Sequence, residues 1–131
     1  MSVSAINNVM IFEDHGHLVV SIQSPLGDDQ WQVLCHRVLA WTRRVTGIVL
    51  DLKGLDVLDS FSTLALRDLC KTLHFHGQKT VISSIPLPVY VTMSIRGLRI
   101  GEAPVAQDLS EAFNILEHPP PYPPAPPGRL Y

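Results

Sequence analysis

The side chains best suited to chemistry are concentrated in one stretch of the sequence, from Asp51 to Thr63. It reads Asp-Leu-Lys-Gly-Leu-Asp-Val-Leu-Asp-Ser-Phe-Ser-Thr and begins at the end of a continuous apolar run. Asp59 or Ser60 is well suited to cap the first turn of a helix, because a side-chain oxygen there can accept backbone N–H groups that lack a partner. A helix cap alone explains the Asp-Ser pair, and it is the simpler of two interpretations.

The second interpretation is a phosphorylation switch at the same serine. The free N–H groups and the dipole of a helix N-terminus favour anions, so the fold would survive a phosphate on Ser60. A partner docked on that surface would meet an added charge of about −1.5 to −2 beside the carboxylates of Asp56 and Asp59. Phosphorylation of Ser60 would then act as a switch on the binding of that partner.

Enzymatic chemistry has little support in the sequence. There is no phosphate-binding glycine loop and no G-x-S-x-G, H-E-x-x-H or C-x-x-C motif. His74 and His76 are two residues apart, so they do not share a helix face, and His15 and His17 flank a turn glycine. A zinc or copper site, or a Ser-His-Asp triad, would need these groups to converge in space, and it stays a remote alternative.

The stretch is expected to lie between a buried strand and a helix. Residues 47–52 are a continuous apolar run, which is typical of a strand covered on both faces of its sheet. From Ser60 onward apolar residues recur at helical spacing until Gly77, which ends the helix.

The remaining elements alternate between strand and helix. They are a hairpin of strands 9–12 and 17–22, a helix from Asp28 that buries Trp31, Leu34, Cys35 and Val38, a strand at 80–83, a helix from Pro86 or Pro88 to Gly97, a short strand at 98–100, and a helix from Asp108 with Glu111 in its first turn. This order predicts an α/β fold with a mixed, mostly parallel sheet of four or five strands and about four helices.

Composition limits the classes of function. The 131 residues are 46% hydrophobic, which suits a single domain with a real core. A net charge of −2 provides no basic field, so nucleic acid and membrane surfaces are not expected as partners. No apolar run is long enough to span a bilayer, no secretory signal is apparent, and the two cysteines, Cys35 and Cys70, suit buried thiols in a reducing compartment. We therefore expect a cytoplasmic protein.

The clearest composition break lies near Glu117. Seven of the 11 prolines fall in the segment 118–131. Proline removes backbone donors and fixes φ, so this segment is expected to be an extended or disordered tail. Residues 1–117 then form the domain.

Five segments carry a resemblance to a known family. They are residues 18–23 (Leu-Val-Val-Ser-Ile-Gln), 28–30 (Asp-Asp-Gln), 47–55, 57–61 (Val-Leu-Asp-Ser-Phe) and 88–92. The chain resembles the STAS domain, the fold of bacterial anti-sigma factor antagonists. The Asp-Ser-Phe element is shared by many STAS proteins. The Val-Ser-Ile-Gln segment and the later Asp-Asp-Gln point to the RsbS group within the family, small single-domain scaffolds of the stressosome, a stress-response complex.

The resemblance implies a role for Ser60 as the residue that a switch serine kinase phosphorylates. Ser62 and Thr63 are secondary candidates. The implied partner-docking residues lie around this serine and are Asp56, Asp59, Ser60, Thr63, Leu64 and Arg67. The family often carries an arginine four residues after the serine, where this chain has Leu64, although Arg67 lies one turn further along the same helical face.

The resemblance also implies a set of partners. An RsbS-type protein co-assembles with an RsbR-type STAS sensor paralogue into a large complex that sequesters an RsbT-type kinase. Phosphorylation releases the kinase, and an RsbX-type phosphatase resets the system. No catalytic residue, metal or cofactor is implied. The alternatives are a soluble anti-sigma factor antagonist that binds an anti-sigma kinase directly and, remotely, a small hydrolase or metal-binding protein.

Overall fold

The computed structural model describes residues 3–6, 8–96 and 103–118. Its strands form one six-stranded sheet in which the spatial order of the strands follows the order of the sequence. The strands are β1 (Val3–Ile6), β2 (Val9–Asp14), β3 (His17–Ile22), β4 (Gly47–Asp51), β5 (Lys79–Ser83) and β6 (Val105–Ala106). The pairs β1–β2 and β2–β3 are antiparallel, and the other three pairs are parallel.

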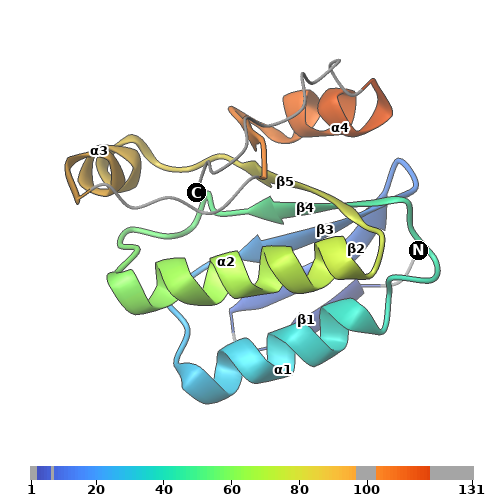
Figure 1. Ribbon diagram of the computed structural model, residues 1–131, viewed down its shortest axis with the longest axis horizontal. Coiled ribbons are helices and arrows are strands. Elements are labelled where there is room, and N and C mark those ends of the chain that lie inside the picture. The colour runs from blue at the N-terminus through green and yellow to red at the C-terminus, as the bar shows by residue number, and fades with distance from the viewer. Residues whose placement is uncertain (1–2, 7, 97–102, 119–131) are drawn as a thin grey trace, which may run out of the picture.

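The helices pack on both faces of this sheet. They are α1 (Asp28–Leu39), α2 (Ser60–Phe75), α3 (Leu87–Arg96) and α4 (Leu109–Glu117). Figure 1 shows α1 and α2 side by side on one face, α4 on the other, and α3 beyond the end towards which the β4 arrow points. The mixed, mostly parallel α/β fold with four helices is therefore confirmed, as are the β2–β3 hairpin and the glycine end of α2, where Gly77 has a φ of +77°.

The sheet has more strands than the sequence predicted. β1 is only four residues long, too short to show a clear alternation in the sequence, and it is defined by its register with β2, from Val3 opposite Phe12 to Ile6 opposite Val9. The short strand expected at 98–100 lies outside the described residues. Within the described residues the last strand is β6, which pairs with the end of β5 and was not predicted from the sequence. The proline-rich segment from 119 onward also lies outside the described residues.

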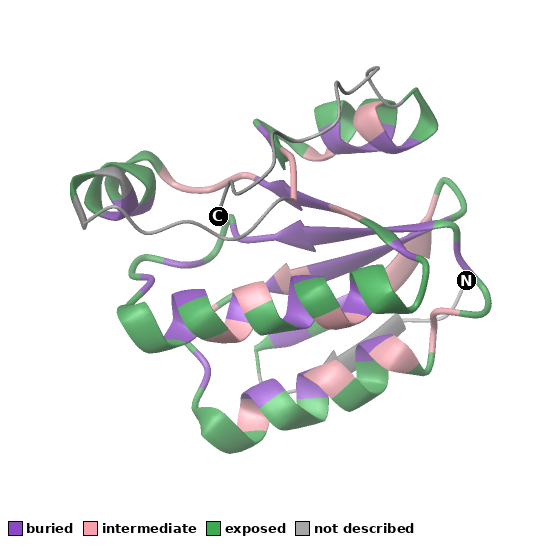
Figure 2. Ribbon diagram, viewed as in Figure 1, coloured by how far each residue is buried: buried purple, intermediate pink, exposed green. Residues whose placement is uncertain are grey.

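Alternation along the strands divides the core into two layers. Ile48 and Leu50 of β4 face α1 and α2, whereas Val49 between them faces α4, and all three are fully buried. The continuous apolar run predicted as a two-sided strand thus fills both layers (Figure 2). Within the described residues, no helix is long and apolar enough to cross a membrane.

A matched pair of substitutions on α2 tests which side of this helix faces the core. Leu66→Ala is expected to lower the free energy of unfolding by about 2–5 kcal/mol, because Leu66 is fully buried and its loss leaves a cavity. Leu64→Ala, on the exposed side, is expected to change the free energy of unfolding by less than about 0.5 kcal/mol. Urea denaturation measures both. Equal losses of unfolding free energy in the two variants would show that α2 does not turn Leu66 towards the core and Leu64 towards solvent.

Candidate functional site

The loop from β4 to α2 is tied to the sheet by the carboxylate of Asp51, the last residue of β4. Its Oδ1 accepts the backbone N–H of Lys53 at 3.0 Å, and its Oδ2 accepts the hydroxyl of Ser21 on β3 at 3.2 Å. The side chain is buried, and both of its oxygens have partners. A single carboxylate therefore holds the start of the loop against the end of the neighbouring strand.

The middle of the loop passes very close to the backbone that follows β3. A Cβ atom at Gly54 would lie only 2.7 Å from the Cα of Gln23, so no residue larger than glycine fits without movement of the backbone. The loop's three leucines, Leu52, Leu55 and Leu58, are all buried. These contacts fix the path of the chain up to the first residue of α2.

The N-cap of α2 is Asp59, one of the two residues that the sequence offered for this position. Its Oδ1 accepts the backbone N–H of Ser62 at 2.7 Å, and its backbone carbonyl accepts the hydroxyl of Thr63 at 2.8 Å. The hydrogen bond from Ser62 is the main cause that lowers the pKa of Asp59 below its ordinary value. The cap is thus an ionised carboxylate at the positive end of the helix dipole.

Ser60 is the first residue of α2, and its side chain is exposed. The two secondary candidates, Ser62 and Thr63, are 5% and 2% exposed. Their hydroxyls lie beneath the first turn, where a kinase could reach them only after local unfolding. Of the three hydroxyl groups that the sequence singled out, the structure therefore presents Ser60 alone to a partner.

The other residues implied in docking fall into three groups. Asp56, Asp59 and Leu64 are exposed beside Ser60, and Arg67 is half-buried one turn beyond Leu64. Thr63 is buried, so its side chain does not belong to the surface on which a partner would dock. Its position in the helix turns it towards the core.

Two exposed apolar residues were missed by the sequence reasoning. Val57 is 62% exposed and Phe61 is 47% exposed, and both flank Ser60 in the chain. For Phe61 the helical spacing of the sequence could have shown this exposure. Once Asp59 is the cap, Phe61 and Leu64 are three residues apart on one side of the helix, away from the buried stripe that contains Leu66. We define the switch surface as Asp56, Val57, Asp59, Ser60, Phe61 and Leu64.

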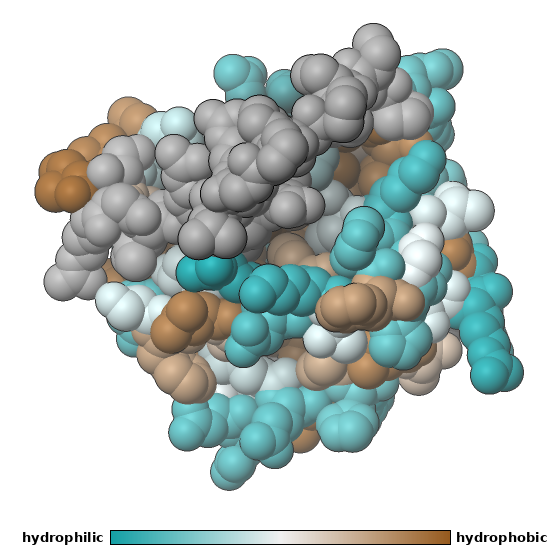
Figure 3. All heavy atoms as spheres, in the orientation of Figure 1, coloured by the Kyte–Doolittle hydropathy of each residue, from teal (hydrophilic) through white to brown (hydrophobic). Residues whose placement is uncertain are grey.

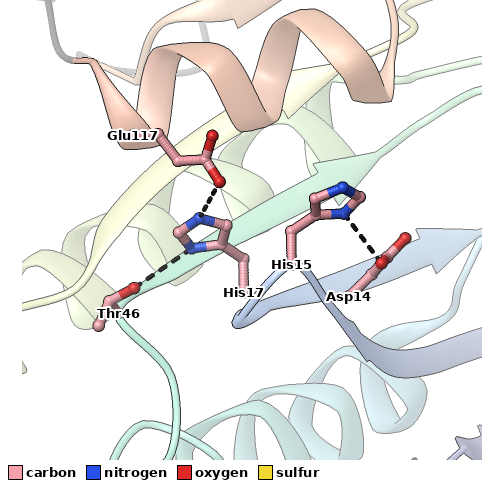
Figure 4. A network of polar contacts seen from close by, with 5 residues as sticks. All are labelled: Asp14, His15, His17, Thr46 and Glu117. Carbon is pink, nitrogen blue, oxygen red and sulfur yellow. Dashed lines mark hydrogen bonds and ion pairs between the residues drawn. The ribbon is translucent and has the colours of Figure 1, made fainter.

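A second polar cluster lies between the β2–β3 hairpin and the end of α4 (Figure 4). His17 is buried, and its Nε2 lies 3.8 Å from Oε1 of Glu117 while its Nδ1 lies 3.3 Å from the hydroxyl of Thr46. Nδ1 of His15 lies 2.9 Å from Oδ1 of Asp14. The two imidazole rings also stack on Phe113, so this cluster joins α4 to the hairpin.

The described residues contain no group of three His, Cys, Asp or Glu side chains placed to hold a metal ion. The thiols of Cys35 and Cys70 are both free. Burial raises the pKa of the Cys70 thiol to about 12 and also raises the pKa of the Cys35 thiol. Both thiols thus favour the protonated form, which is a poor nucleophile.

Comparison with known proteins identifies the architecture. A family model described as the STAS domain matches residues 8–112, which include the whole switch surface. No curated protein matches the sequence at a significant level.

Three solved structures illustrate the likeness. A serine-to-glutamate variant of RsbS from Moorella thermoacetica is 23% identical with a TM-score of 0.69, and the match covers 85% of this chain and 96% of that one. A chain from a structure of the stressosome, described as a signal integration and transduction hub, is 22% identical with a TM-score of 0.62 and coverages of 82% and 95%. An anti-sigma factor antagonist from Mycobacterium paratuberculosis is 16% identical with a TM-score of 0.66 and coverages of 88% and 95%. At these identities the likeness shows a shared fold.

The cap gives a prediction for stability and its pH dependence. Asp59→Ala is expected to lower the free energy of unfolding by about 1 kcal/mol near neutral pH, because the N–H of Ser62 loses its acceptor. Since the native-state pKa of Asp59 is lowered, the ionised carboxylate stabilises the fold above the ordinary carboxyl range, and this contribution is lost as the pH falls through the lowered pKa. The difference in free energy of unfolding between the wild type and Asp59→Ala should therefore become smaller in acid.

Urea denaturation at several pH values measures this difference. Asp56→Ala is the matched control, because Asp56 is an exposed aspartate of the same loop but is not the helix cap. A loss for Asp56→Ala as large as that for Asp59→Ala, or a difference independent of pH down to strong acid, would contradict the assignment of Asp59 as an ionised cap.

Proposed function

The chain belongs to the STAS-domain family, and we propose that it is a non-catalytic phospho-switch scaffold of a stressosome-like complex, which sequesters a switch serine kinase until Ser60 is phosphorylated. The observation that carries this proposal is the position of Ser60. It is the exposed first residue of α2, directly after an ionised cap and among exposed apolar side chains. No other hydroxyl of the first turn is accessible.

A phosphate at Ser60 would change the surface and leave the fold in place. The N-terminus of α2 favours an anion, because its N–H groups and dipole carry partial positive charge. The partner would meet a different surface, because about −1.5 to −2 units of charge would join the carboxylates of Asp56 and Asp59. The neighbouring apolar groups of Val57, Phe61 and Leu64 would then be costly to bury against a partner.

The kinase in this proposal is of the RsbT type and binds the unphosphorylated switch surface. An RsbR-type STAS sensor paralogue supplies the rest of the assembly, and an RsbX-type phosphatase removes the phosphate. The likeness to RsbS and to a chain of the stressosome supports this choice of partners. Control then resides in the difference between the kinase's affinities for the two forms of Ser60.

A second candidate keeps the switch and changes the assembly. The fold is also similar to that of an anti-sigma factor antagonist, which suggests a soluble protein that binds one anti-sigma kinase directly. The mass of the complex separates the two candidates. Co-expression with an RsbR-type paralogue should yield a multi-subunit particle in the first case and no particle in the second.

The site of phosphorylation is the first test. Incubation with a purified RsbT-type kinase, ATP and magnesium is expected to add one phosphate to the wild-type chain and none to Ser60→Ala, because Ser60 is the accessible hydroxyl in the first turn of α2. Intact-mass and site-mapping spectrometry measure both. Ser110→Ala is the matched control, since Ser110 is also an exposed serine in the first turn of a helix capped by an aspartate. A phosphate retained by Ser60→Ala would contradict the proposal.

The apolar part of the switch surface gives a separate prediction. Leu64→Glu is expected to weaken binding of the kinase at least tenfold without loss of stability, because a charge would replace an exposed apolar contact. Calorimetric titration measures the affinity. Val33→Glu, which alters an exposed apolar residue of α1, should bind like the wild type. Equal affinities for the wild type and Leu64→Glu would remove Leu64 from the docking surface.

A further inference from the structure

The acidic side chains are distributed unevenly along the two helices that cover one face of the sheet. α1 has Asp28 and Asp29 in its first turn, and α2 has Asp59 as its cap. Residues 30–50 and 69–101, in contrast, contain no Asp or Glu. The net charge of −2 therefore does not reveal a separation of charge, with acid where α1 and α2 begin and none in the segments where they end.

Three basic side chains lie just beyond the ends of these two helices. Arg43 and Arg44 are in the loop after α1, and Lys79 is the first residue of β5, which follows α2. The side chain of Gln78 joins the two segments, because its Nε2 donates to two backbone carbonyl oxygens of the loop, at 2.6 and 3.3 Å. These carbonyls belong to the residues that flank the arginine pair, so the loop is held beside the start of β5.

All three basic side chains are exposed. Within the part of the chain that the structure describes, no carboxylate pairs with any of them. Arg44 instead lies over the ring of Trp41, with its guanidinium carbon 5.8 Å from the ring centroid. In Figure 1 α1 and α2 both end at the right of the view, and Figure 3 shows hydrophilic atoms extending from that side. Three positive charges are thus gathered at one end of the domain.

The helix dipole does not account for this arrangement. Cations are favourable in the last turn of a helix, which explains His36 and Arg37 in α1 and His74 in α2. The effect falls off beyond that turn, whereas the three basic side chains lie outside both helices. The dipole also gives no reason for Phe75, the last residue of α2, to be 84% exposed.

We propose that Arg43, Arg44, Phe75 and Lys79 form a docking surface for an acidic segment of a protein partner, and we call them the basic surface. Carboxylates of the segment pair with the three cations, which gives the contact its specificity and a fast rate of association. Exposed ion pairs contribute little affinity each. Burial of the ring of Phe75 against an apolar side chain of the segment therefore supplies much of the binding energy.

The rest of this end of the domain favours a partner of limited size. His17 contacts both Thr46, which follows the arginine loop, and Glu117 at the end of α4. Figure 4 shows Asp14 close to the same cluster. A membrane plane or a long nucleic acid that covered the whole end would meet the carboxylates of Asp14 and Glu117. A short acidic segment can lie on the basic surface alone.

The basic surface goes beyond the proposed phospho-switch and is independent of it. The two surfaces share no residue and lie at opposite ends of α2, whose 16 residues span about 24 Å. A partner could therefore occupy the basic surface while a kinase is bound near Ser60. A chain that is not phosphorylated on Ser60 could still bind an acidic segment, so the two proposals can fail separately.

Fluorescence anisotropy with a labelled probe peptide tests the basic surface on the full chain. The probe is a fluorescein-labelled peptide of repeated Glu-Glu-Leu. The wild type is expected to bind it with an affinity that falls as salt is added. Arg43→Glu and Lys79→Glu should each weaken binding about tenfold, because like charges would then meet. Phe75→Ala should weaken binding several-fold without changing its dependence on salt, because it removes an apolar contact.

The matched control is Lys53→Glu, because Lys53 is an exposed lysine at the other end of the domain and its reversal changes the net charge equally. This variant should bind the probe like the wild type, and circular dichroism checks that every variant folds. Absence of binding at about 0.15 M salt, or equal losses in Lys53→Glu and Arg43→Glu, would overturn the proposal. Displacement of the probe by phosphatidylserine vesicles or single-stranded DNA more readily than by unlabelled peptide would overturn it as well, in favour of a membrane or a nucleic acid.

Discussion

The structure depends on one close approach, where the loop after β4 passes the backbone after β3. Gly54 lies against Gln23 with no space for a side chain, and Asp51 ties the same two segments together through both of its oxygens. This contact fixes where α2 begins. Because α2 begins there, Asp59 becomes its cap and Ser60 lies at the surface. The position of one exposed hydroxyl thus follows from a steric limit several residues away.

A phosphate on Ser60 would add negative charge beside the carboxylates of Asp56 and Asp59. The hydrogen bond from Ser62 favours the ionised form of Asp59, so the first turn already carries a negative charge when the serine is unmodified. The apolar side chains beside it offer a partner the burial that drives association. A phosphate on Ser60 would therefore weaken the binding of a partner to this surface. The carboxylates of Asp56 and Asp59 and the cost of removing water from the phosphate would both oppose docking.

The sequence predicted the layers of this fold well because burial leaves a pattern of apolar residues in the chain. The two-sided strand β4 followed from its continuous apolar run, and the buried stripe of α2 followed from the helical spacing of its apolar residues. β1 did not, since its four residues are defined by their register with β2. Asp59 and Ser60 are both good caps, so only hydrogen-bond geometry could choose between them. In α3, apolar residues on both sides cancelled the phase signal, and the sequence could not show which side faces water.

The strand order in space repeats the strand order in the chain, and this affects how the protein can be made. Each described strand after β1 pairs with the strand synthesised just before it, so none of them has to be inserted between two strands that are already in place. The antiparallel pairs β1–β2 and β2–β3 have short connections and cost little loop entropy, whereas each parallel pair must first close a longer crossover connection that contains a helix and so forms more slowly. During translation the sheet can therefore grow from one edge, and each new strand covers the unpaired edge left by the strand before it.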